Sequence, residues 1–250
     1  MKSSYYKYFA ALLLFGSNGI VASNINLPSY EIVLLRLLLG SLFLITVFTV
    51  SRQRFTFYRN KHTCLYLFIS ASAMGASWML LYEAYQQVGI SIASLAYYCG
   101  PVIVMILSPF LFRETLTWPK IAGFLTVLAG MCLVNLQALD EGKTIWGLFC
   151  GLMSAFMYAL MVTANKKAKP ESGLENSLLQ LVIGSFIVVA FVSMQKNFVL
   201  SLTTIDWIPV LLLGLLNTGI GCYLYFSSIT DLPVQTVAIC GYLEPLSAVV

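Results

Sequence analysis

A stretch of eleven residues occurs twice in this chain, 144 positions apart. Glu31–Ser41 and Glu175–Ser185 are identical at six of their eleven positions. The same offset pairs Gly75 with Gly219, Leu80 with Leu224, Tyr98 with Tyr242 and Pro101 with Pro245. The register therefore holds over most of the chain and predicts two copies of one unit, residues 1–137 and 144–250.

Composition places both copies in a lipid bilayer. Hydrophobic residues make up 59% of the 250 residues, charged residues make up 10%, and the mean hydropathy is +0.86. A soluble domain of this size needs more polar surface. The charges lie between apolar runs of roughly 17–22 residues, long enough to cross ~30 Å of hydrocarbon as helices. Nine such runs are predicted, at 8–27, 30–50, 64–85, 90–112, 118–136, 144–163, 178–194, 207–228 and 232–250.

The ninth run reaches Val250 without a flanking charge. By the repeat offset, the counterpart of run 118–136 would follow it. We therefore expect a chain cut short, or a fragment, of a ten-helix protein. The predicted fold is all-α, a polytopic membrane bundle of two inverted five-helix repeats with the tenth helix missing here.

The positive charges predict the orientation. Eleven lysines and arginines lie at the N-terminus and in the loops after the second, fourth and sixth runs, whereas two, Lys143 and Lys196, lie in the opposite loops. Positive loops favour the cytoplasmic side, so the N-terminus is expected there. Because each copy has an odd number of helices, the second copy enters the membrane from the other side, which gives inverted topology.

We find no motif for metal binding, phosphate binding or catalysis. The six cysteines form no Cys-x-x-Cys pair and no cluster with the single histidine, His62. A Gly-rich phosphate loop and a Ser/His/Asp set are also missing. We therefore predict no cofactor, no metal, no catalytic residue and no nucleic-acid partner. The expected partners are the bilayer, a small-molecule metabolite and, for coupling, a proton or cation.

Two opposite charges lie inside the apolar runs. Arg36 lies in the second run and Glu244 in the ninth, and an ionised side chain at mid-bilayer costs about 2.5–3.5 kcal/mol. Both side chains are therefore expected to face the protein interior, a partner or a wet cavity. For Arg36 the alternative is snorkelling to the headgroups or a local pair with Glu31. For Glu244 the alternative is a packing role beside Pro245.

Helix breakers and aromatic side chains complete the predicted pocket. Pro101 and Pro245 each remove a backbone donor and clash with the preceding turn, which is tolerated where a cavity or a neighbour satisfies the freed groups. Trp78, Tyr82 and Tyr85 share one helical face, and so do Asn217 and Tyr225. Each aromatic alone is also typical of an interface belt or of packing. The predicted substrate-binding or coupling residues are Asn18, Arg36, Trp78, Tyr82, Tyr98, Asn217, Tyr242 and Glu244.

Four stretches resemble the EamA-type family of the drug/metabolite transporter superfamily. They are Leu34–Gly40, Ala93–Pro101, Leu111–Thr117 with the Gly123 and Gly130 that follow, and Gly241–Pro245. The resemblance covers essentially the whole chain. It implies a ten-helix carrier of the inner membrane, often an exporter of amino acids or other small metabolites, with its pocket between the halves. Glu114 matches the acidic residue that the family places at the cytoplasmic end of the fourth helix, and we interpret it as structural.

The predicted function is a secondary transporter that exports a small metabolite, such as an amino acid or related compound, by alternating access. The substrate would bind among the first, third, fourth, sixth, eighth and ninth helices. Glu244 would be the proton- or cation-sensitive group, and Arg36 its partner or the anchor of a substrate carboxylate. The sequence equally permits facilitated diffusion. Two other classes stay open: a non-transporting membrane protein, such as a lipid-directed enzyme or a receptor, and a narrow channel.

Overall fold

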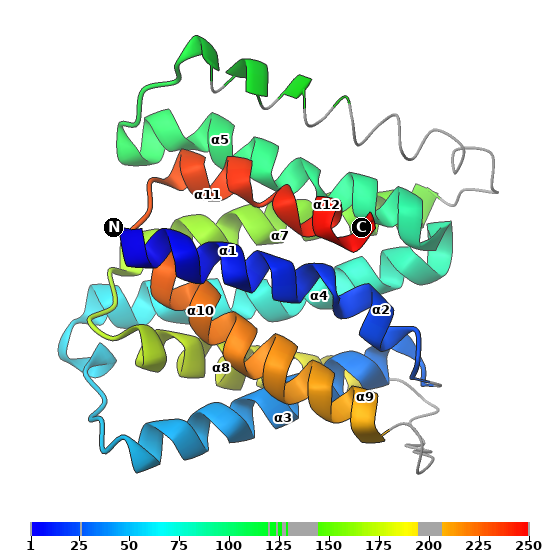
Figure 1. Ribbon diagram of the computed structural model, residues 1–250, viewed down its shortest axis with the longest axis vertical. Coiled ribbons are helices and arrows are strands. Elements are labelled where there is room, and N and C mark those ends of the chain that lie inside the picture. Colours follow the sequence, from blue (N-terminus) through cyan, green and yellow to red (C-terminus); the bar gives the residue numbers. More distant parts are fainter. Residues whose placement is uncertain are drawn as a thin grey trace.

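The computed structural model describes residues 2–25, 27–119, 121–123, 125, 126, 129, 145–194 and 207–249. Its regular elements within these ranges are helices, which lie roughly alongside one another with their connections gathered at two opposite ends (Figure 1). The N-terminal half contains α1 (Lys2–Gly16), α2 (Asn18–Ala22), α3 (Ser29–Val50), the 3-10 turn η1 (Phe57–Arg59), α4 (Lys61–Tyr97) and α5 (Cys99–Phe112). The C-terminal half contains α7 (Ile145–Ala168), α8 (Gly173–Ser193), α9 (Trp207–Leu211), the π-helix η3 (Leu212–Ile220), α10 (Gly221–Ser228), α11 (Val234–Cys240) and α12 (Leu243–Val249).

Within the part of the chain that the structure describes, six helical segments are long and apolar enough to cross a membrane. They are Tyr30–Val50, Lys61–Ile90, Ile92–Phe112, Ile145–Ala168, Gly173–Ser193 and Trp207–Ser228, and they correspond to six of the nine predicted runs. The first and ninth predicted runs are also helical, but each is divided into two short helices, α1 with α2 and α11 with α12. The fifth run, 118–136, lies mostly outside the described residues. The prediction of an all-α polytopic bundle is confirmed.

The boundary between the third and fourth runs lies within the predicted connection between residues 85 and 90, but it is tighter than a loop. The element α4 runs to Tyr97 and turns sharply at Gly89, where φ is 80° and ψ is 163°. Glycine adopts this conformation without a steric penalty because it has no Cβ. The chain therefore reverses direction with almost no loop, and the fourth span consists of the end of α4 followed by α5.

Small residues and hydroxyl pairs hold the centre of the bundle together. A Cβ added to Gly151 of α7 would lie 2.8 Å from the Cβ of Ala96, and one added to Gly75 of α4 would lie 2.8 Å from the carbonyl oxygen of Gly184. Between α4 and α7, the Ser77 hydroxyl donates to the carbonyl of Ser154 at 2.9 Å, and the Ser154 hydroxyl donates back to the carbonyl of Ser77 at 2.8 Å. Close backbone approach and interhelical hydrogen bonds are what stabilise helix contacts in lipid, where apolar burial gives little driving force.

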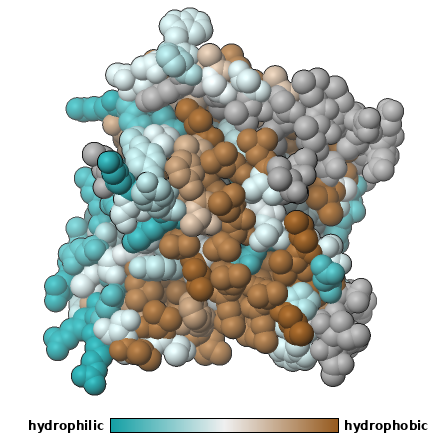
Figure 2. Space-filling view, viewed as in Figure 1, coloured by the Kyte–Doolittle hydropathy of each residue, from teal (hydrophilic) through white to brown (hydrophobic). Residues whose placement is uncertain are grey.

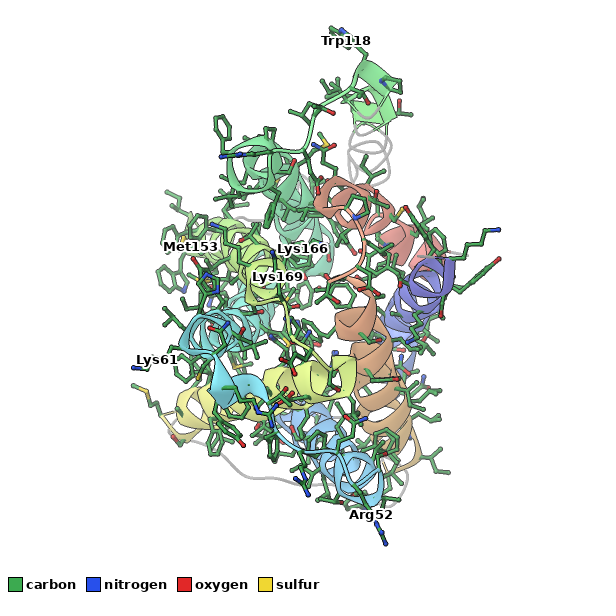
Figure 3. The ribbon with its side chains drawn as sticks, turned by 90° about the vertical axis from the view of Figure 1, so that its left-hand side faces the viewer. Arg52, Lys61, Trp118, Met153, Lys166 and Lys169 are labelled. Carbon is green, nitrogen blue, oxygen red and sulfur yellow. The ribbon has the colours of Figure 1, made fainter. Side chains whose placement is uncertain are left out.

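The surface divides into an apolar middle and a polar end. Figure 2 views the same face of the molecule as Figure 1. It shows hydrophobic residues across the centre of that face and hydrophilic residues toward the side where the N-terminus lies. Phe110, Phe186 and Ile208 are 81%, 69% and 71% exposed, as expected for side chains that face lipid. Arg52, Lys61, Lys166 and Lys169 lie on the polar end, which Figure 3 views along the helices. We call it the basic end.

Candidate functional site

Three helix breaks supply irregular backbone inside the bundle. The first separates α1 from α2 at Ser17, the second separates α4 from α5 at Tyr98, and the third separates α11 from α12 at Gly241 and Tyr242. The second and third breaks are 144 residues apart, and Pro101 and Pro245 are the third residues of α5 and α12. A proline is tolerated in the first turn because the missing donor has no intrahelical acceptor there.

A fourth irregular segment, the π-helix η3, lies within the eighth span and carries two polar side chains. Asn217 donates from Nδ2 to the carbonyl of Leu14 at 2.8 Å, to the Ser17 hydroxyl at 2.9 Å and to Oδ1 of Asn18 at 3.0 Å. Thr218 donates to the carbonyl of Leu213 at 2.8 Å. The Asn217 side chain therefore bonds to residues on both sides of the break between α1 and α2, while Thr218 faces α3. Such π segments recur at functional sites because they redirect side chains from the regular helical faces.

Arg36 of α3 is held inside the bundle. Its side chain is 6% exposed, its Nε–H donates to the Thr218 hydroxyl at 3.0 Å, and its guanidinium carbon lies 4.3 Å from the centre of the Trp78 ring. A guanidinium over an indole face is attracted by the ring quadrupole. Neither snorkelling nor a pair with Glu31 describes this side chain. Among the described residues only its Nε–H is hydrogen-bonded, and the two terminal NH₂ groups form no hydrogen bond there.

Glu244 of α12 lies beside the first helix break. A Cβ added to Gly16 would come within 2.9 Å of the Glu244 carbonyl oxygen, so α12 packs directly on α1 at that point. The half-buried carboxylate forms no hydrogen bond or ion pair with any described residue, and the direct pair with Arg36 that we predicted as one option is absent there. Arg36 is nevertheless near enough for its charge to act on Glu244 through space.

A cluster of tyrosines lies in the same region as this carboxylate. Tyr8, Tyr85, Tyr97, Tyr98 and Tyr158 lie within electrostatic range of Glu244. The cluster draws on both halves, because Tyr97 of α4 packs on Tyr158 of α7, and Tyr8 of α1 packs on Tyr225 of α10, each pair with ring centres 5.5 Å apart.

Tyr98 and Tyr242, which the repeat offset relates, meet in this cluster. The Tyr242 hydroxyl donates to the backbone carbonyl of Tyr98 at 2.9 Å, and the two ring centres lie 6.4 Å apart. The hydroxyls of Tyr158 and Tyr225 lie 3.4 Å apart. The arrangement offers aromatic faces and several hydroxyl groups around one carboxylate and one guanidinium.

The structure brings most of the predicted site residues into this region. Asn18 and Asn217 meet at the first break, Arg36 and Trp78 stack, and Tyr98, Tyr242 and Glu244 lie at the other two breaks. Tyr82 lies one turn beyond Trp78 on α4 and packs edge-on against Tyr85, with ring centres 5.3 Å apart.

Sequence reasoning missed several residues of the site. Three of them, Tyr8, Tyr158 and Thr218, lie within apolar runs. No local sequence pattern distinguishes them from residues that only pack. Glu83 could have been found, because it is an acidic residue inside the third run. It accepts hydrogen bonds from the Tyr30 hydroxyl, from Nε2 of Gln87 at 3.1 Å and from Nε1 of Trp146 at 3.4 Å.

The counterpart of Arg36 in the second half has a different environment. Gln180 is fully buried and donates from Nε2 to the Ser70 hydroxyl at 2.9 Å. Asn165 and Asn176 exchange amide hydrogen bonds of 2.9 and 3.1 Å in the same network between α4, α7 and α8. These amides satisfy one another, so this network is a packing feature.

Two carboxylates at the basic end accept backbone N–H groups of the other half, and we call these contacts the carboxylate clamps. Glu175 of α8, which is 1% exposed, accepts from the N–H of Thr56 at 2.6 Å, from the Thr56 hydroxyl at 2.6 Å and from the N–H of Phe57 at 2.9 Å. Glu114, which follows α5, accepts from the N–H groups of Val234 at 2.8 Å and Gln235 at 3.0 Å, the first residues of α11. Each half therefore contributes one carboxylate and receives one.

The model of the EamA-like transporter family matches residues 3–136 and 145–250. This chain belongs to the EamA-like transporter family. It is therefore a multi-pass membrane transporter.

Named relatives are 21–27% identical to this chain over the aligned residues. The uncharacterized transporter YxxF of Bacillus subtilis (strain 168) is 27% identical over 251 residues, which cover 98% of this chain and 79% of the relative. The uncharacterized transporter YetK of the same organism is 26% identical over 99% of this chain and 78% of its own length. The biotin transporter of Escherichia coli (strain K12) is 21% identical over 72% of this chain and 61% of its own length.

A solved crystal structure shares the fold. It superposes with a TM-score of 0.82 at 18% sequence identity, covering 99% of this chain and 87% of that chain. At this identity the likeness shows the arrangement of the helices alone.

Proposed function

We propose that this EamA-like transporter exports a small zwitterionic metabolite, such as an amino acid or a related compound, by alternating access. The observation that carries the proposal is the placement of Arg36 and Glu244, two opposite charges in one aromatic region that do not pair with each other. A substrate carboxylate would bind the terminal NH₂ groups of Arg36, and a substrate ammonium group would bind Glu244. Charge-assisted hydrogen bonds of this kind are stronger than neutral ones.

Alternating access needs two halves that can separate at one end while they stay together at the other. The carboxylate clamps suit this role, since they join the halves only at the basic end and can break without unfolding a helix. In this proposal residues 1–137 and 144–250 are two inverted repeats, and the described arrangement is the one closed at the basic end. Glu244, between the substrate and the first helix break, is the group through which a proton or cation would couple.

The basic end is proposed to lie in the cytoplasm of a cell with the protein in its inner membrane, because positively charged loops are retained on that side. In a cysteine-free background, Gln53→Cys and Glu171→Cys should react with an impermeant maleimide only after permeabilisation. Ser23→Cys, at the opposite end, should react in intact cells. Labelling of residue 171 from outside would contradict the inverted arrangement.

Counterflow tests the transport class directly. Proteoliposomes preloaded with an unlabelled amino acid should accumulate the labelled compound from outside transiently, because a carrier exchanges across the membrane faster than it moves net substrate. A channel would give no such overshoot. A protein that binds a ligand but never gives counterflow, across a panel of amino acids, would be a receptor or an enzyme rather than a carrier.

Biotin is the second substrate to include in that panel. Relatives at 21–22% identity are named biotin transporters, and biotin carries a carboxylate that Arg36 could bind but no ammonium group for Glu244. The two substrates therefore differ in their need for Glu244. If biotin is the substrate, Glu244→Gln should leave its counterflow nearly unchanged, whereas amino-acid counterflow should fall.

A further inference from the structure

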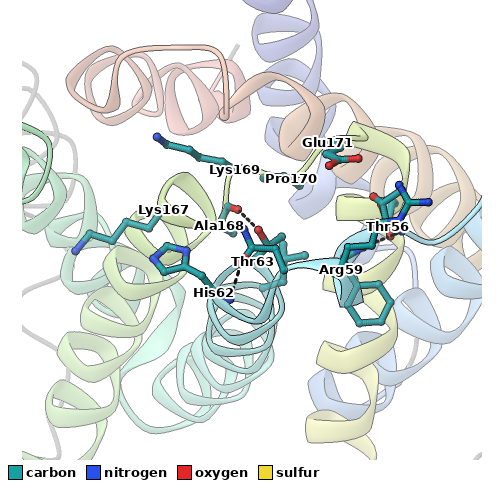
Figure 4. Close-up of a pocket in the computed structure, with 13 residues that line it drawn as sticks. Thr56, Arg59, His62, Thr63, Lys167, Ala168, Lys169, Pro170 and Glu171 are labelled. Atoms are coloured by element: carbon teal, nitrogen blue, oxygen red, sulfur yellow. Dashed lines mark hydrogen bonds between the residues drawn. The ribbon is translucent and has the colours of Figure 1, made fainter.

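We propose that a pocket at the basic end binds the phosphate group of an anionic phospholipid and that the bound lipid holds the two halves together there. The pocket lies where α4 begins, α7 ends and α8 begins, between the segment 56–63 of the N-terminal half and the segment 167–175 of the C-terminal half (Figure 4). The Thr63 hydroxyl donates to the carbonyl of Ala168 at 3.0 Å and joins the two segments. This site is separate from the Arg36 and Glu244 region and does not depend on the identity of the substrate.

The charge at this pocket favours an anion. Arg59, Lys167 and Lys169 line it, together with the exposed imidazole of His62. In Figure 4 the two lysines lie on one side of His62 and Arg59 lies on the other, so the cations flank the pocket. Lysine and arginine side chains are long enough to close on a ligand that enters between them.

Two acidic residues at the pocket, Glu171 and Glu175, offset its positive charge to different degrees. Glu175 also lines the pocket, but it is 1% exposed and its carboxylate accepts three hydrogen bonds from Thr56 and Phe57, which offset its charge. Glu171 is exposed at the edge of the pocket and opposes an anion there. Removing the Glu171 charge should therefore strengthen anion binding, so the proposal predicts one variant with a higher affinity.

The helix ends add to the attraction. The N-termini of α4 and α8 both border the pocket, and the positive end of a helix dipole stabilises an anion within its first turn. Asn60 caps α4 by accepting the N–H of His62 at 2.9 Å, and Ser172 caps α8 by accepting the N–H of Glu175 at 3.4 Å. These caps fix the two helix starts on either side of the pocket.

The surroundings favour a lipid over a free phosphate ion. The pocket lies at the ends of three membrane-spanning segments, Lys61–Ile90, Ile145–Ala168 and Gly173–Ser193, which is the level of lipid headgroups. Directly along α4 from this level, Leu65 and Phe68 are 57% and 56% exposed and share one helical face. Cations at the headgroup level with exposed apolar side chains one or two turns deeper match the two parts of a phospholipid.

The test is a lipid titration on the purified full-length protein by native mass spectrometry, which needs no transport assay. Phosphatidylglycerol should bind more tightly than phosphatidylcholine. The variant Arg59→Gln/Lys169→Gln should weaken phosphatidylglycerol binding about 30-fold, or about 5-fold for each positive charge removed. Glu171→Gln should tighten it. The matched control Lys2→Gln/Lys7→Gln removes the same charge from the N-terminal helix at the same end and should leave the affinity unchanged.

Three results would overturn the proposal. If the control variant weakened phosphatidylglycerol binding equally, the binding would depend only on the net charge of the protein. Equal binding of phosphatidylglycerol and phosphatidylcholine would mean that the anionic headgroup is not recognised. Thermal stabilisation by inorganic phosphate alone, with no further effect of phosphatidylglycerol, would assign the pocket to a soluble phosphate compound. A failure of amino-acid counterflow would leave all of these measurements valid, so the two proposals can fail separately.

Discussion

Replacing Arg36 or Glu244 is expected to reduce amino-acid transport at least about tenfold. Arg36→Gln removes the donors for the substrate carboxylate, and Glu244→Gln removes the acceptor for the ammonium group, each a charge-assisted interaction of about 1.5–3 kcal/mol. The double variant should be less damaged than the sum of the two, because both residues act on one substrate. Initial rates of counterflow in proteoliposomes measure all three variants.

The structure adds a control that distinguishes a shared substrate from a direct ion pair. Because Arg36 and Glu244 do not touch and interact only through space, the coupling between their effects on thermal stability without substrate should be weak. Strong coupling should appear only in transport. Strong coupling in the stability of the substrate-free protein would instead mean that the two side chains pair directly in the resting state. Additive losses in transport would mean that the two residues do not bind one common substrate.

Breaking a carboxylate clamp is expected to open the basic end. In Glu114→Gln the side-chain amide would place donor hydrogens against the N–H group of Val234 or Gln235. In Glu175→Gln the amide oxygen would accept from the N–H groups of Thr56 and Phe57 without the charge that strengthens these bonds. Loss of one charge-assisted contact of about 1.5–3 kcal/mol should raise the population open at this end by about 10- to 100-fold. With Cys99 as the only cysteine, beside the break at Tyr98, its maleimide labelling from the basic end should accelerate by a comparable factor.

Glu171→Gln serves as the matched control for Glu175→Gln. It removes the same charge four residues earlier on an exposed side chain. In detergent without anionic phospholipid, labelling of Cys99 in this variant should stay at the wild-type rate. If both clamp variants also kept the wild-type rate, the clamps would be permanent supports of the fold rather than part of a gate. In that case both variants should instead lower the thermal stability without changing access to Cys99.

The sequence alone determined the class of fold and the approximate position of the spans. Long apolar runs can form only helices in lipid, because every backbone donor and acceptor must be satisfied within its own segment. That constraint is local, so runs such as 30–50 and 144–163 could be placed from composition and length. The helix breaks near Tyr98 and Tyr242 could also be anticipated, because Pro101 and Pro245 act on their own preceding turns.

The tertiary structure decided which polar groups meet. That Arg36 donates to Thr218 and stacks on Trp78, rather than pairing with Glu244, depends on how α3, α4 and η3 pack. The tyrosines at positions 8 and 158 join the site for the same reason. Likewise, Ser172 and Glu175 have the spacing of a local capping pair, yet the Glu175 carboxylate reaches across to Thr56 and Phe57. Hydropathy specifies that a segment lies in the membrane. Contacts between segments far apart in the chain depend instead on the rotation and register of each helix. Small residues such as Gly75 and Gly151 fix these by allowing two helices to approach closely.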